Sequence, residues 1–359
     1  MGKNIYFIGS YTEVQGHAPH ACGEGIYIIS QDRETGLLSI ESRMTDIENP
    51  SWVHWDSGRK KLYAATENSG DDGELVSYNY NSEKQLTELS RQRGPGNAVC
   101  HLLTLSKQNL LLTVSYISGT LEGFELKNSL PERRQHIFQY KGNGPNLERQ
   151  EGPHAHQLCP DNYENKLYVC DLGSDRIWMH DLKSPDLKQE TALEVPKGYG
   201  PRHMVMDGQS SLAYILCELQ PKLLVAHIFE DGEEKGRMEI LEEHHTAAVD
   251  DRAKAAPAAI KIHPSGNTLY VSNRFVDSIT VFSLDRSDNS ASVHKVDEFS
   301  SRGKTPRDFT FSPDGKWLLI GNQDSSDIQC CRIDPETGLS LNEWTPALKI
   351  GTPVCLVPL

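Results

Sequence analysis

Residues 260–282, IKIHPSGNTLYVSNRFVDSITVF, contain the pattern that decides the fold. Three short apolar segments, 260–263, 269–273 and 278–282, follow one another and are separated by turn-forming residues. The Pro-Ser-Gly turn at 264–266 is typical of the short connections between hairpin strands. No helical periodicity separates the segments, so the stretch predicts three antiparallel strands in succession.

The middle segment of this stretch recurs along the whole chain. Each copy places an apolar or aromatic pair before small and polar residues, and successive copies are 46–57 residues apart. The copies lie at 5–9, 62–66, 111–115, 167–171, 213–217, 269–273 and 318–322. A third apolar segment and a weaker fourth segment follow each copy, and an alternating first segment precedes most of them. Four strands per repeat, without intervening helices, predict the blades of a β-propeller.

The two ends of the chain are predicted to share one blade. Seven second strands are preceded by only six first strands, and Pro-Val-Cys-Leu-Val at 353–357 resembles those six. We therefore expect an all-β, seven-bladed propeller forming one domain over residues 1–359, with its last blade closed by the N- and C-terminal strands. The alternative architecture is a large β-sandwich or a pair of barrels. The charged segment 232–251 lacks strand alternation and is predicted to be a loop or an insertion.

Composition excludes several classes of partner. The chain has 36 basic and 50 acidic residues and a net charge of −14, which argues against binding nucleic acid or an anionic membrane. No apolar run reaches the roughly 20 residues of a membrane-spanning helix, and the N-terminal residues lack the apolar core of a signal peptide. Eight cysteines without a Cys-x-x-Cys pair predict buried, reduced thiols and a cytoplasmic location.

Polar side chains gather at one predicted end of the propeller. The first two strands of each blade are antiparallel neighbours, so the start of the first and the end of the second lie at the same mouth of the central channel. Binding residues commonly occupy such loops and strand ends. The site candidates at the starts of first strands are His101, His154, His156, Arg202, His203 and Arg307. Those at the ends of second strands are Glu67, Glu218, Arg274 and Gln323.

Four of these candidates, from consecutive repeats, are expected to be catalytic: His156, Arg202, Glu218 and Arg274. Two guanidinium groups can hold a carboxylate or a phosphate, and one can stabilise an oxyanion. Glu218 or a neutral His156 can take a proton from water, and the choice depends on burial. Each residue alone also fits a structural role, such as an ion pair between blades. The other six candidates are expected to bind substrate.

The sequence contains no cofactor signature. It lacks the nucleotide-binding glycine motifs, so no cofactor is expected. It also lacks the Gly-x-Ser-x-Gly elbow that carries the nucleophilic serine of many hydrolases. The His-Ala-His pair at 154–156 has no accompanying ligands at metal-binding spacing, so no metal is expected either. The sequence does not decide whether a cation lies in the channel.

At these positions the chain resembles the seven-bladed propeller lactonase family, which includes bacterial propeller-type 6-phosphogluconolactonases and fungal 3-carboxy-cis,cis-muconate lactonizing enzymes. The most specific part is Gly-Pro-Arg-His at 200–203 followed by Glu218. The matching segments lie at 49–51, 149–156, 171–176, 198–203, 217–218, 270–274, 305–307 and 322–323. In the muconate enzymes a His, an Arg, a Glu and a second Arg form the proposed active-site set. The resemblance places that set on the four residues expected to be catalytic.

These features together favour an enzyme that hydrolyses a sugar lactone, with 6-phosphogluconolactone as the expected substrate and 6-phosphogluconate as the product. Water would be activated at the channel mouth, and arginines would bind the anionic group. A muconate-type lactonizing cycloisomerase and a non-enzymatic ligand-binding propeller are the alternatives. The expected partner is a small-molecule lactone or sugar acid, and the sequence does not predict the oligomeric state.

Overall fold

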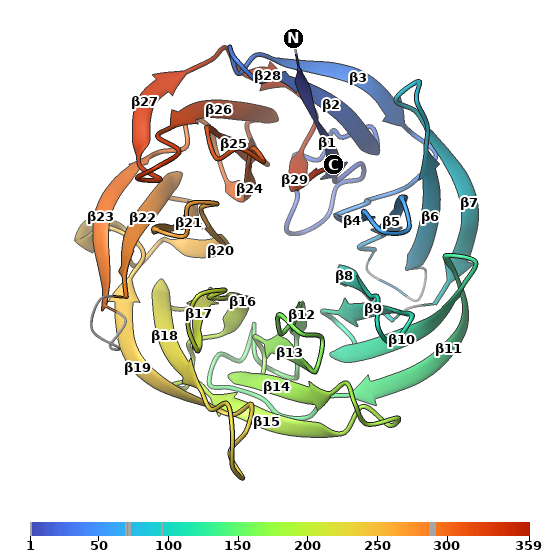
Figure 1. Cartoon of the computed structure of the whole chain (residues 1–359), viewed down its shortest axis with the longest axis vertical. Helices are drawn as coiled ribbons and strands as arrows, with labels where there is room; N and C mark the ends of the chain where they lie inside the picture. The colour runs from blue at the N-terminus through green and yellow to red at the C-terminus, as the bar shows by residue number, and fades with distance from the viewer. Residues whose placement is uncertain (1, 69, 71–72, 95, 287–291) are drawn as a thin grey trace.

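The computed structural model describes residues 2–68, 70, 73–94, 96–286 and 292–359. Seven antiparallel sheets surround a central channel (Figure 1), which confirms the predicted propeller. The helical part of the described chain is one short 3-10 turn, η1 (Val249–Asp251), and no helix there has the length and apolar character needed to cross a bilayer.

Each blade is a sheet of four strands ordered from the channel outward (Figure 1). The innermost strands are β4 (Trp52–Asp56), β8 (Val99–Leu105), β12 (Ala155–Pro160), β16 (Pro201–Met206), β20 (Ala256–Ile262), β24 (Pro306–Phe311) and β29 (Pro353–Pro358). The second strands are β5 (Lys61–Ala65), β9 (Leu110–Ser115), β13 (Lys166–Asp171), β17 (Leu212–Cys217), β21 (Thr268–Arg274), β25 (Trp317–Asn322) and β1 (Lys3–Ser10).

The outer half of each blade follows the same order. The third strands are β6 (Glu74–Tyr80), β10 (Thr120–Lys127), β14 (Arg176–Asp181), β18 (Lys222–Ile228), β22 (Ser278–Asp285), β26 (Asp327–Ile333) and β2 (Ile26–Asp32). The outermost strands are β7 (Leu86–Arg93), β11 (Leu130–Gln139), β15 (Gln189–Glu194), β19 (Met238–His245), β23 (Ser292–Ser300), β27 (Ser340–Trp344) and β3 (Leu38–Met44). A further short strand, β28 (Leu348–Lys349), pairs with β26.

The ring closes through the two ends of the chain, as predicted. Strand β1 pairs with β2 on one side and with β29 on the other. Tyr6 lies opposite Pro358 in this second ladder, and Ser10 lies opposite Pro353. The closing blade therefore has the same four-strand order as the others. Because β29 covers the inner edge of β1, that edge is not left unpaired, and β29 takes the innermost place that the first strands hold in the other blades.

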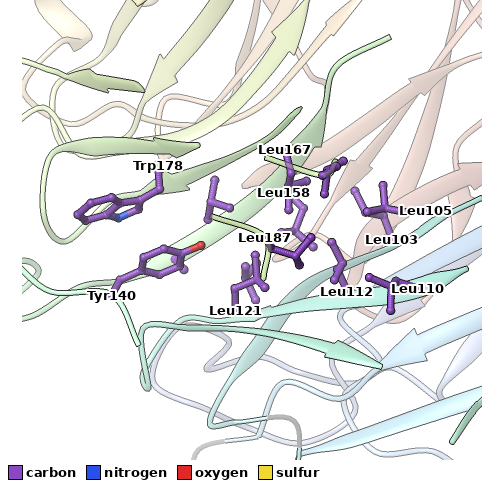
Figure 2. Packing of buried hydrophobic residues seen from close by; sticks show 14 of the residues in the cluster. Leu103, Leu105, Leu110, Leu112, Leu121, Tyr140, Leu158, Leu167, Trp178 and Leu187 are labelled. Atoms are coloured by element: carbon purple, nitrogen blue, oxygen red, sulfur yellow. The ribbon is translucent and has the colours of Figure 1, made fainter. Parts of the chain in front are cut away.

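The hydrophobic core lies between neighbouring blades. Figure 2 shows one such cluster, in which Leu112 and Leu121 of one blade pack with Leu158 of the next. In the same cluster the rings of Tyr140 and Trp178 are stacked with centroids 5.4 Å apart. Since each sheet is packed on both faces, its second and third strands are apolar along their length rather than alternating. This two-sided burial explains the short continuous apolar runs that reveal the repeat.

The prediction of a loop at 232–251 was wrong for its central part. Residues 238–245 form β19, the outermost strand of its blade, which pairs with β18. Met238 and Ile240 pack against the hydrophobic cluster, while Glu239 between them is exposed. An outermost strand faces water on one side, and the many charged residues of this one concealed its alternation.

The cysteines largely follow the expectation of buried, unpaired thiols. None of the eight is in a disulfide, and six are buried. Cys159 is partly buried, and the prediction was wrong for Cys22, which is exposed.

Candidate active site

Several of the innermost strands have the same irregularity at the mouth of the channel. The pairing of β12 with β13 skips one residue, His156, and the pairing of β16 with β17 skips Arg202. In the same way β24 skips Arg307 and β8 skips Cys100. Such β-bulges re-aim the extra side chain and are common next to active sites. All four skipped residues line one small cavity at the mouth end of the channel.

This cavity brings together half of the site residues predicted from the sequence. Its remaining lining comes from neighbouring inner strands and strand ends, and includes Trp52, Glu67 and His203. The predicted candidates that line it are Glu67, His156, Arg202, His203 and Arg307. They come from four different blades, so the propeller closure is what places them around one volume.

Glu218, which follows β17, is held by three guanidinium groups. Arg202 Nη1 donates to Oε2 at 2.5 Å, and Arg149 Nη2 donates to Oε1 at 2.7 Å. Arg274 Nη2 lies 3.0 Å from Oε2. The side chains of Glu218, Arg202 and Arg274 are at most 8% exposed, whereas that of Arg149 is 41% exposed. The cluster is therefore buried on the channel side and open to solvent only at Arg149.

This charge arrangement makes Glu218 a poor base. Burial by itself would raise the pKa of the Glu218 carboxyl, but the charges of Arg274, Arg202 and Arg149 outweigh burial and hold that pKa well below its usual range. A carboxylate with such a low pKa accepts a proton only at a large cost. The geometry thus favours a role for Glu218 in orienting the arginines over a role in proton transfer.

Three buried imidazoles lie beside the arginines. The ring centroids of His156 and His203 are 5.1 Å apart, and those of His101 and His203 are 6.3 Å apart. Each ring has one nitrogen without a hydrogen-bond partner among the described residues: Nδ1 of His101, Nδ1 of His156 and Nε2 of His203. Burial, reinforced by the charge of Arg202, lowers the pKa of His156 and of His203 well below the usual value, and burial lowers the pKa of His101 to about 3. All three rings are therefore neutral at pH 7, and His156 and His203 line the cavity, where they can bind water or substrate.

Arg307 is held differently from the other arginines. Its Nη2 donates to the Tyr11 hydroxyl at 2.9 Å, and its Nη1 donates to Gln323 Oε1 at 3.3 Å. The Tyr11 hydroxyl in turn donates to Glu67 Oε2 at 2.6 Å. Among the described residues, no carboxylate oxygen lies within 4.0 Å of the Arg307 guanidinium. Its charge is thus less closely balanced than that of Arg202 and is more available to an anionic ligand.

Two predicted site residues have their polar atoms engaged by the protein. His154 Nδ1 lies 2.8 Å from the Tyr116 carbonyl oxygen and Nε2 lies 3.1 Å from Glu151 Oε1, while the ring stacks on Tyr116 with centroids 4.3 Å apart. The Gln323 amide accepts from Arg307 and donates to the His17 carbonyl oxygen at 3.0 Å. Both residues lie next to the cavity and support its walls instead of lining it.

The loop that joins β1 to β2, residues 11–25, covers part of the mouth. Gln15 Nε2 donates to the Glu67 carbonyl oxygen at 2.8 Å, and His17 Nε2 lies 3.6 Å from Glu67 Oε1. The contact between His17 and Gln323 anchors the loop on the opposite side. Figure 1 shows this loop, in blue, reaching from the closing blade toward the channel axis.

Sequence reasoning missed Tyr11 and Arg149. Tyr11 follows the second strand of the closing blade, the position that Glu218 and Gln323 occupy in their blades. Applying the same strand-end rule to the first repeat would have found it. Arg149 lies on the long connection between β11 and β12, so only its place in the motif at 149–156 pointed to it. In the described part of the chain, no group of three or more His, Cys, Asp or Glu is placed to hold a metal ion.

Comparison with known proteins identifies the family of this chain. Residues 5–358 match the family described as "Lactonase, 7-bladed beta-propeller". A 6-phosphogluconolactonase from Bacillus subtilis (strain 168) is 28% identical over 359 residues, covering 99% of this chain and 98% of that protein. A 6-phosphogluconolactonase from Formosa agariphila is 26% identical over 344 residues, covering 92% of this chain and 93% of that protein.

The fold also matches solved structures. The periplasmic gluconolactonase of Pseudomonas aeruginosa superposes with a TM-score of 0.88 at 22% identity, covering 100% of this chain and 99% of the other. At that identity the likeness concerns the fold alone. The family match, which spans almost every residue, is the stronger result. This chain belongs to the lactonase family of seven-bladed β-propellers.

Proposed function

We propose that this protein hydrolyses 6-phosphogluconolactone to 6-phosphogluconate at the channel mouth. The observation that carries the proposal is the cavity in which Arg202, Arg307 and the neutral His156 meet, all three placed there by β-bulges. The two family relatives named 6-phosphogluconolactonase support the choice of substrate. They give no support to the cycloisomerase or to a non-enzymatic propeller.

The charge at the mouth suits a phosphorylated substrate. A further carboxylate in the cavity wall, Asp308, is balanced by Lys261 at 2.9 Å. Apart from that pair, four guanidinium groups and two carboxylates gather there and sum to +2: Arg149, Arg202, Arg274, Arg307, Glu67 and Glu218. A phosphate near pH 7 carries a charge approaching −2 and three acceptor oxygens, so it balances this excess. We assign its binding to Arg307, which has no carboxylate in contact among the described residues.

In the proposed mechanism His156 takes a proton from water as the water oxygen attacks the lactone carbonyl. Arg202 stabilises the oxyanion that forms. Its Nε and Nη1 are fixed by the Ala258 carbonyl oxygen at 3.0 Å and by Glu218, which leaves Nη2 for the substrate. The tetrahedral intermediate then collapses, the ring C–O bond breaks, and the imidazolium returns its proton to the departing ring oxygen. The new carboxylic acid loses a proton to solvent.

The first test is hydrolysis of freshly prepared 6-phosphogluconolactone, coupled to oxidation of 6-phosphogluconate. The wild type should exceed the spontaneous rate, and His156→Gln should lower kcat by about 10²–10⁴-fold because the proton acceptor is gone. His180→Gln is the matched control, since His180 is also fully buried but is bonded to Tyr140 and Leu187 in the outer part of its blade. A wild type no faster than the spontaneous reaction would refute the proposed function.

A second test concerns the phosphate. Arg307→Ala should raise KM for 6-phosphogluconolactone by about 10–100-fold, the effect of losing one or two hydrogen bonds to a charged group. The same variant should leave KM for unphosphorylated gluconolactone nearly unchanged. Arg286→Ala is the control, because Arg286 binds Asp207 at the opposite end of the channel. An equal rise in KM for both lactones would assign Arg307 another role.

We also propose that the reaction takes place in the cytoplasm. The support is that all eight cysteines are unpaired, which is typical of a reducing compartment.

A further inference from the structure

The turn between β13 and β14, residues 171–175, contacts no part of the cavity yet is bonded to the loops that carry site residues. We call it the anchor turn. At its first position, Asp171 Oδ1 accepts the His154 backbone N–H at 2.7 Å, and Oδ2 accepts Trp178 Nε1–H at 2.9 Å. Asp171 is fully buried. It therefore fixes the end of the 141–154 loop, two residues before His156.

The last residue of the anchor turn, Asp175, joins two separate loops. Its Oδ1 accepts Gln150 Nε2–H at 2.8 Å and the Gly200 N–H at 2.9 Å, and its Oδ2 accepts the Gly198 N–H at 2.7 Å. Gln150 is the neighbour of Arg149, and Gly200 lies two residues before Arg202. Both Asp175 and Gln150 are 0% exposed. One buried carboxylate thus ties together the segments that bring two arginines to Glu218.

Close packing around Gly173 supports the same link. A Cβ atom at Gly173 would lie 1.9 Å from the Gly152 carbonyl oxygen and 2.8 Å from the His154 nitrogen. The 141–154 loop therefore rests directly on the backbone of the anchor turn. A larger residue at 173 would push the loop away, so the contact is part of the way in which the loop is placed.

We propose that Asp175 is a positioning residue for the active site, which sets Arg149 and Arg202 so that both reach Glu218. A carboxylate suits this place because it offers acceptor sites on both oxygens to three N–H donors. An asparagine would replace one oxygen with an NH₂ group, which would face a donor instead of accepting from it. The activity tests below rest on the proposed lactonase function, and the proteolysis test does not.

The first experiment compares Asp175→Asn with Asp207→Asn. Asp207 is a matched control, because it is 3% exposed, accepts the Gln209 N–H at 3.0 Å and binds Arg286, but lies beyond the far end of β16 from Arg202. Asp175→Asn should lower kcat/KM by about 10²-fold, as a displacement of about 1 Å does in an active site. Asp207→Asn should keep at least a third of wild-type activity, while the two variants lose similar amounts of thermal stability.

A double-mutant cycle then tests whether the effect passes through Arg149. Gln150→Leu removes one bond to Asp175, and Arg149→Ala removes the side chain that this bond would position. If the coupling holds, the double variant loses no more activity than Arg149→Ala alone. Fully additive losses would overturn the link from Asp175 through Gln150 to Arg149.

Limited trypsin digestion tests the anchor without any assay of function. The Arg149–Gln150 bond lies on the anchored loop, and the Arg149 side chain is 41% exposed. Cleavage after Arg149, followed by mass spectrometry, should be at least about tenfold faster in Asp175→Asn than in the wild type or Asp207→Asn, because a freed loop opens locally more often. Unchanged cleavage in Asp175→Asn would overturn the anchor even if the lactonase activity is confirmed. If Asp175→Asn is cleaved faster and the wild type shows no lactonase activity, the proposed function is refuted while the anchor is confirmed.

Discussion

Replacing Arg202 with alanine is expected to lower kcat/KM for lactone hydrolysis by about 10²–10³-fold, the effect of removing one preorganised oxyanion donor. Arg202 is the bulged residue of β16 and lines the cavity beside His156. It also donates to Glu218 Oε2, so its loss removes one of the three charges around that carboxylate. The fall should appear mainly in kcat, because the oxyanion exists only after water has attacked.

The protein should remain folded in this variant. Arg149 and Arg274 still contact Glu218, so no buried carboxylate is left without a partner. Arg202→Lys should recover part of the activity but not all of it, since an ammonium group cannot bond Glu218, the Ala258 carbonyl and the substrate from one plane. Arg237→Ala is the control, because Arg237 pairs with Glu234 at the surface. Activity within threefold of the wild type for Arg202→Ala, at unchanged melting temperature, would exclude it from the reaction.

The fold was predictable because the repeat consists of short apolar runs, which form strands that are buried on both faces of their sheet. Runs such as 167–171 and 269–273 stand out in any part of the chain, and their spacing alone gives the number of blades. The outermost strands were harder to predict, since they face water on one side. Strand β19 is the clear case, where glutamates on the exposed face concealed the alternation of Met238 and Ile240.

The site was predictable to the extent that strand ends determine it. Knowing that first and second strands are antiparallel was enough to expect Arg202, Glu218 and Arg274 at one mouth. The bulges were not predictable, because they depend on the pairing register between the first and second strands at the start of each first strand. The role of Arg149 was not predictable either, since the path of a loop as long as 141–154 is fixed by distant contacts such as that of Gln150 with Asp175.

The choice of base also required the structure. The sequence left Glu218 and His156 as equal candidates, and the pKa of each is lowered in the structure. What separates them is that both Glu218 oxygens already accept hydrogen bonds from arginines, whereas His156 lines the cavity and has a ring nitrogen without a partner among the described residues. Burial is the main cause of the low His156 pKa, and Arg202, which also holds the Glu218 pKa low, lowers it further, because a positive charge stabilises a carboxylate and destabilises an imidazolium. The arginines therefore keep Glu218 charged against its burial, whereas burial itself keeps His156 neutral at pH 7.

Burial of the channel histidines predicts that the protein loses stability steeply below pH 6.5. In the unfolded chain an imidazole binds a proton near pH 6.5. In the folded protein His156 and His203 have pKa values well below that, and burial lowers the pKa of His101 to about 3. Below pH 6.5 the unfolded state therefore binds up to three more protons than the folded state at these sites, and the free energy of unfolding falls as the pH falls.

The size of this effect follows from the proton count. Each proton taken up only on unfolding gives a slope of about 1.4 kcal/mol per pH unit, so the three channel imidazoles together give about 4 kcal/mol per pH unit. His54 and His180, whose pKa burial lowers to about 4, add to this slope. Less than about two units of acidification would therefore remove most of a typical stability of about 5–15 kcal/mol. Above pH 7 the three residues contribute no slope, because both states are neutral there. The carboxylate of Glu218, whose pKa is also depressed, adds a further loss only at pH values below its unfolded pKa of about 4.3.

Urea unfolding at pH 7.5, 6.0, 5.5 and 5.0 measures the slope. His101→Gln should reduce it by about 1.4 kcal/mol per pH unit, the share of one proton, even if the variant is less stable at every pH. Phe309→Leu is the control, since it loosens the buried core without removing a titrating group and should leave the slope unchanged. A wild-type stability that is flat from pH 7 to pH 5 would mean that water reaches the channel imidazoles freely and protonates them in the folded state. In that case His156 would also be charged near pH 6, and the pH profile of kcat would show an acid limb at that value instead of well below it.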